Sequence, residues 1–148
     1  MTGKESKESI AEETLRTCGV RRTSARLTIL NLLGERHDHP TAEQIAATVR
    51  ERGERVSVAT LYQNLNKLVE SGAIGRLKGP DGRMHFDAIA APHHHLICQR
   101  CGCIVDVALE RMLPAMAMPW CPHTGQPLYD WSLQSMQIEL KGLCPACR

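Results

Sequence analysis

The sequence predicts an α+β fold, with helices in its first half and short strands in its second. Apolar residues recur at helical spacing as far as Gly72, and the first strand-turn-strand pattern comes only after it. Two C-x-x-C pairs then lie near the end of the chain. With 43% hydrophobic and 23% charged residues among 148, the composition is that of a globular protein with one ordinary core or two small ones.

The composition also argues against a membrane-spanning protein. No segment of the sequence approaches the ~20 consecutive apolar residues that a membrane helix needs. The opening MTGKESKESIAEE is charged and lacks the apolar segment of a secretory signal. We therefore expect a cytoplasmic protein with no membrane partner, whose cysteine thiols stay reduced.

Three or four helices are expected before the first strand, and most of them carry a start or stop signal. Gly19 ends the first helix, and Thr23 can cap the second. Thr41, with Gln44 three residues later, has the spacing of a capping box for the third. The expected ranges are 10–18, 23–33, 41–53 and 57–72.

The turn sequence GPDG separates two candidate strands, Ala73–Lys78 and Arg83–Asp87. Helices followed by a two-stranded hairpin give the order of a winged helix-turn-helix, whose last helix enters the DNA major groove. We therefore interpret Ser57–Ser71 as a DNA-reading helix. The alternative is an amphipathic helix with an ordinary polar outer face.

Polar residues of that helix are the candidate DNA contacts, because they can hydrogen-bond to base edges and to phosphates. Four arginines and no acidic residue lie between Leu15 and Gly34, which is a weak indication of phosphate contact. The candidate DNA-binding residues are Arg21, Ser57, Thr60, Tyr62, Gln63, Asn64 and Lys67.

A domain boundary is expected in the uncharged, proline-containing stretch that follows the hairpin. We divide the chain into a winged-helix domain (residues 1–87), a hinge (residues 88–92) and a second, metal-binding domain (residues 93–148). The second domain should contain strands over 94–99, 103–107 and 136–141, with a helix over 108–118 and a loop over 119–130 between the last two strands.

Cys98-x-x-Cys101 and Cys144-x-x-Cys147 predict a structural zinc site. Each pair offers two thiolates from one turn, and four thiolates complete a tetrahedral Zn(II) site with no open position. Such a site would contribute folding free energy and would not be catalytic. Cys103, two residues past the first pair, could be a spare ligand or a redox thiol, but we expect a small buried residue.

The three histidines before the first cysteine pair indicate a second kind of site. If they continue into a strand, His93 and His95 share one face and can present two imidazoles to one metal, although a solvated loop edge has the same sequence. Asp87 and Asp106 could add oxygen donors. Nitrogen and oxygen donors without thiolate suit Fe(II), Mn(II), Ni(II) or Zn(II).

Several motifs, in order and spacing, resemble the ferric uptake regulator family of bacterial metal-responsive transcription factors. They are GVRRTSARLTIL, HPTAEQI, SVATLYQNL, RMHFD and HHHLICQRCGCIVD, followed by the last C-x-x-C. The resemblance extends from about Cys18 to Cys147. It implies a winged helix that binds palindromic double-stranded operators, and a carboxy-terminal α/β domain that forms a homodimer.

The resemblance also implies residue roles. Cys98, Cys101, Cys144 and Cys147 would hold structural zinc, and a regulatory metal would lie between the domains on His39, Asp87, His93, His95 and Asp106. Aspartate at 106 resembles the peroxide-sensing members, in which Fe(II) reacts with hydrogen peroxide and ligands matching His39 and His93 are oxidised. Tyr62 matches a thymine-contacting tyrosine, and Gln63 is a variable specificity position.

The sequence therefore favours a metal-dependent transcriptional repressor that senses peroxide through Fe(II) or Mn(II). Three alternatives stay open at this point. An iron- or zinc-uptake regulator would share the architecture. A metalloenzyme could use the His/Asp site, although no general base or nucleophile elbow is evident beside it. A zinc-stapled interaction module would show no salt-dependent affinity for DNA.

Overall fold

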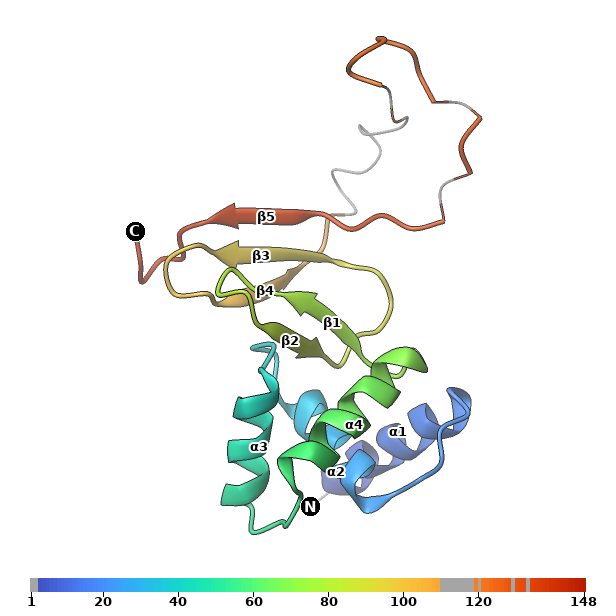
Figure 1. Ribbon diagram of the computed structural model, residues 1–148, viewed down its shortest axis with the longest axis vertical. Helices are drawn as coiled ribbons and strands as arrows, with labels where there is room; N and C mark the ends of the chain where they lie inside the picture. Colours follow the sequence, from blue (N-terminus) through green and yellow to red (C-terminus); the bar gives the residue numbers. More distant parts are fainter. Residues whose placement is uncertain (1–2, 110–118, 120, 129, 133) are drawn as a thin grey trace.

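The first half of the chain is helical and the rest forms two small sheets, so the predicted α+β class is confirmed (Figure 1). The computed structural model describes residues 3–109, 119, 121–128, 130–132 and 134–148. The helices are α1 (Gly3–Thr17), α2 (Ser24–Glu35), α3 (Ala42–Glu51) and α4 (Val58–Glu70). The strands are β1 (Gly75–Lys78), β2 (Met84–Asp87), β3 (His94–Cys98), β4 (Ile104–Val107) and β5 (Glu139–Gly142). No helix among the described residues is long and apolar enough to cross a membrane.

The helices begin where the sequence places their caps. Thr23 and Ser57 are the N-caps of α2 and α4, and each side chain accepts a hydrogen bond from a backbone N–H of the first turn. The capping box predicted for α3 is present in both directions, because Thr41 and Gln44 each accept from the other's backbone N–H. Gly72, with φ of 73°, ends α4 in the left-handed conformation that glycine adopts without steric cost.

Apolar faces of all four helices form the main core. Leu15, Leu32, Ile45 and Leu65 are each at most 1% exposed, and Phe86 from β2 joins them. The hairpin β1–β2 is therefore anchored to the helices by its own strand. This packing fixes the orientation of α4, because α4 contacts both α2 and α3.

Two antiparallel strands and a three-stranded sheet complete the fold. β1 pairs with β2, and the second sheet has the order β4-β3-β5, with β3 antiparallel to β4 and parallel to β5. Figure 1 shows the β1–β2 hairpin lying between the helices and the three-stranded sheet. Leu77 of β1 is buried with Ile97 and Ile104 of that sheet, so the two halves share an apolar contact.

Several predicted boundaries were wrong by a few residues. Helix α1 begins at Gly3 rather than Ile10, because its first turns are polar and give no apolar periodicity. Strand β5 covers 139–142 instead of 136–141. Ala108 and Leu109 are not helical, and the remainder of the helix predicted over 108–118 lies outside the described residues. Residues 88–93 connect β2 to β3 without helix or strand, where the hinge was predicted.

Candidate metal and DNA-binding sites

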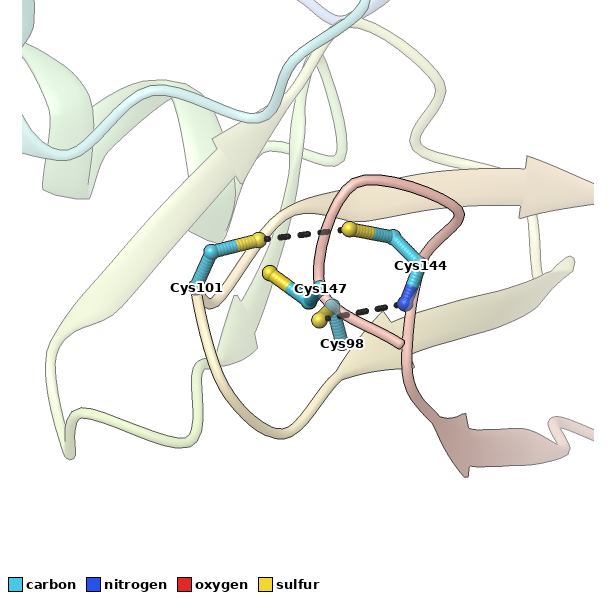
Figure 2. Close-up of side chains that lie close together, drawn as sticks. All are labelled: Cys98, Cys101, Cys144 and Cys147. Carbon is cyan, nitrogen blue, oxygen red and sulfur yellow. Dashed lines mark hydrogen bonds between the residues drawn. The ribbon is translucent and has the colours of Figure 1, made fainter.

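The four cysteines of the two C-x-x-C pairs come together at one end of the three-stranded sheet (Figure 2). Cys98 ends β3 and Cys101 lies in the turn that follows it, whereas Cys144 and Cys147 lie in the turn after β5. Because β3 and β5 are parallel neighbours, the turns that follow them lie at the same end of the sheet. Strand pairing therefore brings together two knuckles that are far apart in sequence.

The sulfur positions fit a tetrahedral zinc ion. All four Sγ atoms lie within 4.8 Å of one another, and Cys101 Sγ is 3.7 Å from Cys144 Sγ. With Zn–S bonds near 2.3 Å, a regular tetrahedron puts its sulfurs about 3.8 Å apart. The donor set is also the one that structural zinc prefers, so the residues fit this ion by spacing and by chemistry.

Backbone N–H groups around the knuckles favour the thiolate form that a metal requires. The amides of Cys101 and Cys144 lower the pKa of Cys98 to about 5, and Cys144 N lies 3.3 Å from Cys98 Sγ. The neighbouring thiol of Cys144 and burial raise the pKa of Cys147 to about 12. Four sulfurs this close cannot all ionise without a cation between them, which is the electrostatic situation of a metal site.

Cys103 was predicted to be a small buried residue in a strand, and this prediction was wrong. The residue is exposed and precedes β4. Its backbone oxygen accepts a hydrogen bond from Cys98 N at 2.9 Å, which closes the turn containing Cys101. The turn covers residues 99–103, so it is two residues longer than the predicted one, and Gly102, with φ of 76°, lies within it.

A second cluster joins His39, Asp87, His93, His95 and Asp106. His39 lies in the segment that leads into α3, and Asp87 is the last residue of β2. His95 on β3 is directly opposite Asp106 on β4 in the antiparallel register. The residues therefore come from the helical half and from the three-stranded sheet, and the cluster connects the two.

In this cluster, each histidine presents its Nε2 atom to the same two carboxylate oxygens. Asp87 Oδ2 lies 3.2, 2.8 and 3.5 Å from the Nε2 atoms of His39, His93 and His95. Asp106 Oδ1 lies 2.8, 3.2 and 3.5 Å from the same three atoms. Ligands at ~2.1 Å from one ion are about 3 Å apart when they are at right angles and about 3.4 Å apart in a tetrahedron. The observed distances are those of neighbouring ligands around a single ion.

Together with His95, His39 is the most deeply buried of these ligand candidates. Its side chain is 2% exposed, and among the described residues neither ring nitrogen has a partner in hydrogen-bonding geometry, although Nε2 is 2.8 Å from Asp106 Oδ1. Burying an imidazole nitrogen without such a partner costs free energy. A metal ion bound to Nε2 would satisfy one of the two atoms.

The charges of the cluster are strongly coupled. Burial lowers the pKa of His39 and of His93, but the two aspartates outweigh it and raise both values, with the Ala91 carbonyl adding to the effect at His93. Burial and the neighbouring His93 lower the pKa of His95. Burial raises the pKa of Asp87, but the nearby His39 imidazole and the Ile89 N–H lower it to about 2. Protons and a metal cation therefore compete for the same positions.

Two groups outside the cluster hold two of its rings, and neither contact was predicted from the sequence. Ala91 O lies 2.8 Å from His93 Nδ1, so this nitrogen carries the proton and Nε2 keeps its lone pair for a metal. Gln137, which precedes β5, places its amide 3.4 Å from His95 Nδ1. Alternation with Met136 and Ile138 could show Gln137 on a strand face, but it could not show which ring the side chain meets.

Most of the predicted DNA-binding residues are exposed. Ser57, Thr60, Tyr62, Gln63 and Lys67 are exposed on α4 or at its N-cap. Arg21, also exposed, lies before α2. Ser57 is partly engaged already, because its hydroxyl caps the helix at Thr60.

Two of the predicted contacts are engaged within the protein. The Asn64 side chain is half-buried; its amide accepts from Arg26 Nε at 3.0 Å and donates to Thr60 O. The Tyr62 hydroxyl donates to Glu43 Oε1 at 2.6 Å, which lowers the pKa of Glu43 and raises that of Tyr62. Asn64 thus helps to join α2 to α4, and Tyr62 is 39% exposed beside α3.

Comparison with known proteins gives consistent results for sequence and fold. The model of the family described as "Ferric uptake regulator family" matches residues 17–117. The chain is 33% identical over 144 residues to the peroxide-responsive repressor PerR of Staphylococcus epidermidis, covering 97% of this chain and 91% of that protein.

Solved structures have the same fold. The ferric uptake regulator of Vibrio cholerae has a TM-score of 0.68 at 25% identity, with 90% of this chain and 98% of that chain covered. The ferric uptake regulator of Helicobacter pylori has a TM-score of 0.74 at 22% identity, with 95% and 93% covered. The likeness extends over nearly the whole of both chains.

Proposed function

The chain belongs to the ferric uptake regulator family, and from this premise we propose that it is a metal-dependent repressor that senses hydrogen peroxide. Members of this family regulate transcription in response to metals, so the chain is a regulator of this kind and not an enzyme. Membership in this family also excludes two of the alternatives considered above, a metalloenzyme and an interaction module that does not bind DNA. In our proposal the chain acts in the cytoplasm as a homodimer on a palindromic operator.

The observation that carries the proposal is the convergence of three imidazole nitrogens and two carboxylates from both halves of the chain. His39 and Asp87 belong to the helical half, whereas His93, His95 and Asp106 precede or lie in the three-stranded sheet. We assign the regulatory metal to these five residues. A cation held there would tie the orientation of α4 to that of the sheet.

The donor set favours Fe(II) or Mn(II) and also accommodates Zn(II). It contains nitrogen and oxygen but no thiolate, and affinity alone does not choose among these metals. Fe(II) bound there would supply the electrons that activate hydrogen peroxide. The imidazole of His39 or His93 would gain one oxygen atom, and the second oxygen of the peroxide would leave as water.

His39 has the geometry to convert this oxidation into loss of DNA binding. It lies three residues before the start of α3, and α3 packs on α4, so removing His39 as a ligand would release the helices from the sheet. The metal would favour the closed arrangement only as long as the ligands in that arrangement bind it more tightly than those in the open arrangement do. In this scheme oxidised dimers release the operator.

The thiolate cluster has a separate role in the proposal. Cys98, Cys101, Cys144 and Cys147 would hold Zn(II) with all four positions filled, leaving none for a substrate or oxidant. This zinc would stabilise the turns at the ends of β3 and β5 whether or not the regulatory metal is bound. DNA contact would come from the exposed face of α4 and from Arg21.

The proposal can be tested with one reaction and two readouts. A duplex is first selected from random-sequence DNA by the Mn(II)-loaded protein. The Fe(II)-loaded protein then receives one equivalent of hydrogen peroxide without oxygen, and operator binding and peptide masses are measured. We expect one oxygen added at His39 or His93 and loss of binding, with Mn(II)-loaded protein unaffected.

Each other outcome has a defined meaning. Unmodified histidines with undisturbed binding would contradict peroxide sensing and indicate an iron- or zinc-uptake regulator. Operator binding that does not depend on any metal would contradict the regulatory site itself.

A further inference from the structure

His85 is a buried histidine that belongs to neither cluster. It lies on β2, two residues before Asp87, and is 8% exposed. Its Nδ1 atom is 2.6 Å from the backbone oxygen of His39. A carbonyl oxygen can only accept a hydrogen bond, so Nδ1 of His85 must carry the proton and donate.

The residue that receives this hydrogen bond has an unusual backbone. His39 has φ of 51° and is the only non-glycine residue with positive φ among those the structure describes. This left-handed conformation is sterically unfavourable for a residue with a side chain and persists only where its surroundings hold it. The conformation determines the direction of the His39 imidazole.

Strand β2 supplies the surroundings that hold His39. Phe86 N donates to Pro40 O at 3.0 Å, and Thr41 forms an antiparallel bridge with His85. The 39–41 segment therefore lies along β2 as a short additional strand. Within this pairing, the His85 side chain provides the hydrogen bond that reaches the His39 carbonyl itself.

The opposite side of the His85 ring is fitted to the hairpin turn. Its Nε2 atom is 3.4 Å from Asp81 Oδ1, and a Cβ atom added at Gly79 would lie 2.5 Å from it. Only glycine at 79 leaves room for the imidazole in this position. The ring thus spans the distance between the turn of the β1–β2 hairpin and the residue that leads into α3.

We propose that His85 is a positioning residue that directs His39 toward the regulatory metal. This inference rests on the proposed regulatory site, which it extends to a residue outside the ligand set. The hydrogen bond from His85 stabilises the left-handed backbone of His39 and so sets its Nε2 atom beside Asp87 and Asp106. A partner of this kind preserves ligand geometry, and losing one typically costs about 10–100-fold in metal affinity.

The test is Mn(II) titration of the full-length, zinc-replete protein, because Mn(II) reports affinity without oxidising the histidines. His85→Leu fills the space but cannot donate, and we expect it to lower Mn(II) affinity ~10–100-fold with full zinc content. His85→Asn is the matched variant, since its amide nitrogen takes the place of Nδ1. We expect its affinity to lie within about threefold of the unmodified protein.

Variants that lack His39 separate positioning from general loosening of the fold. His39→Ala should lower Mn(II) affinity in every background if the regulatory site is correctly assigned. If His85 acts through His39, the double variant His39→Ala/His85→Leu should bind Mn(II) no more weakly than His39→Ala alone.

The failures of the two proposals can be told apart. Unchanged affinity in His39→Ala would overturn the site, and the inference about His85 with it. A loss in His39→Ala combined with normal affinity in His85→Leu would overturn the role of His85 alone. A further tenfold loss in the double variant, or a His85→Asn protein as weak as His85→Leu, would also contradict it.

Discussion

The two clusters of candidate metal ligands differ in what they connect. The four cysteines lie in two neighbouring turns of one sheet, and strand pairing between β3 and β5 is enough to bring them together. The His/Asp cluster needs the helical half, the hairpin and the sheet to be docked at once, because its members lie before α3, at the end of β2 and on the sheet.

This difference separates stabilising a fold from controlling it. A metal held within one part of a protein adds to the stability of that part. A metal held between parts adds only to the stability of one arrangement of them, and can therefore act as a signal. Within the His/Asp cluster the two oxygen donors differ in exposure. The side chain of Asp87 is 7% exposed, whereas that of Asp106 is 32% exposed.

The largest effect should come from opening the cysteine cluster. In Cys98→Ser we expect loss of the bound zinc and a drop of about 3 kcal/mol or more in the free energy of unfolding, because structural zinc contributes ~10–16 kcal/mol of binding free energy in small zinc domains. Zinc content by atomic emission and thermal unfolding measure the two quantities. Cys121→Ser is the control, since Cys121 is outside the cluster. A zinc-replete, equally stable Cys98→Ser protein would refute the structural assignment.

The next largest effect should be confined to the other cluster. His39→Ala removes a ligand candidate whose side chain is only 2% exposed, and we expect at least ~100-fold weaker Mn(II) binding and loss of metal-dependent operator binding, with zinc retained. His37→Ala is the matched control, because His37 is exposed and only two residues away. If His39→Ala also loses its zinc, the two clusters are not independent and the comparison fails.

The two clusters also differ in how far the sequence could predict them. The cysteine spacing alone predicted a tetrahedral site, because each pair forms a local turn whose chemistry does not depend on the rest of the fold. His93 and His95 could be paired from strand geometry. His39 could not, since it lies 54 positions before His93 and nothing local brings them together; only the resemblance to a family suggested it.

Prediction of the fold from the sequence has the same limit. The capping box of Thr41 and the stop at Gly72 were predicted correctly because they depend on neighbouring residues. The start of α1 was missed because a polar helix has no apolar period, and the loss of residues 136–138 from β5 depends on where its parallel partner β3 begins. The roles of His85 and Gln137 were likewise out of reach, since each depends on a contact made only after docking.

Acidity should affect the clusters unequally. The pKa values of His39 and His93 are raised, so both bind protons near neutral pH and release them as the pH rises through these values. A metal must displace those protons, and Mn(II) affinity should therefore increase by ~10-fold or more from pH 6 to pH 8. The zinc content should stay constant over this range. Mn(II) affinity that is flat with pH would show that protonated histidines do not oppose the metal.

The smallest effect should come from a residue that touches neither cluster. Tyr62 lies on the exposed face of α4 with its hydroxyl on Glu43, and we expect Tyr62→Ala to weaken specific operator binding by ~1–3 kcal/mol, as for the loss of a base contact. Fluorescence anisotropy with the selected duplex and with a scrambled one measures this difference. Glu43→Gln keeps an acceptor for the hydroxyl and should bind nearly normally. Both metals should be retained, because α4 supplies no ligand to either cluster. Equal losses on the two duplexes would instead make Tyr62 a packing residue between α3 and α4, and the DNA-reading face would then have to be sought in its neighbours.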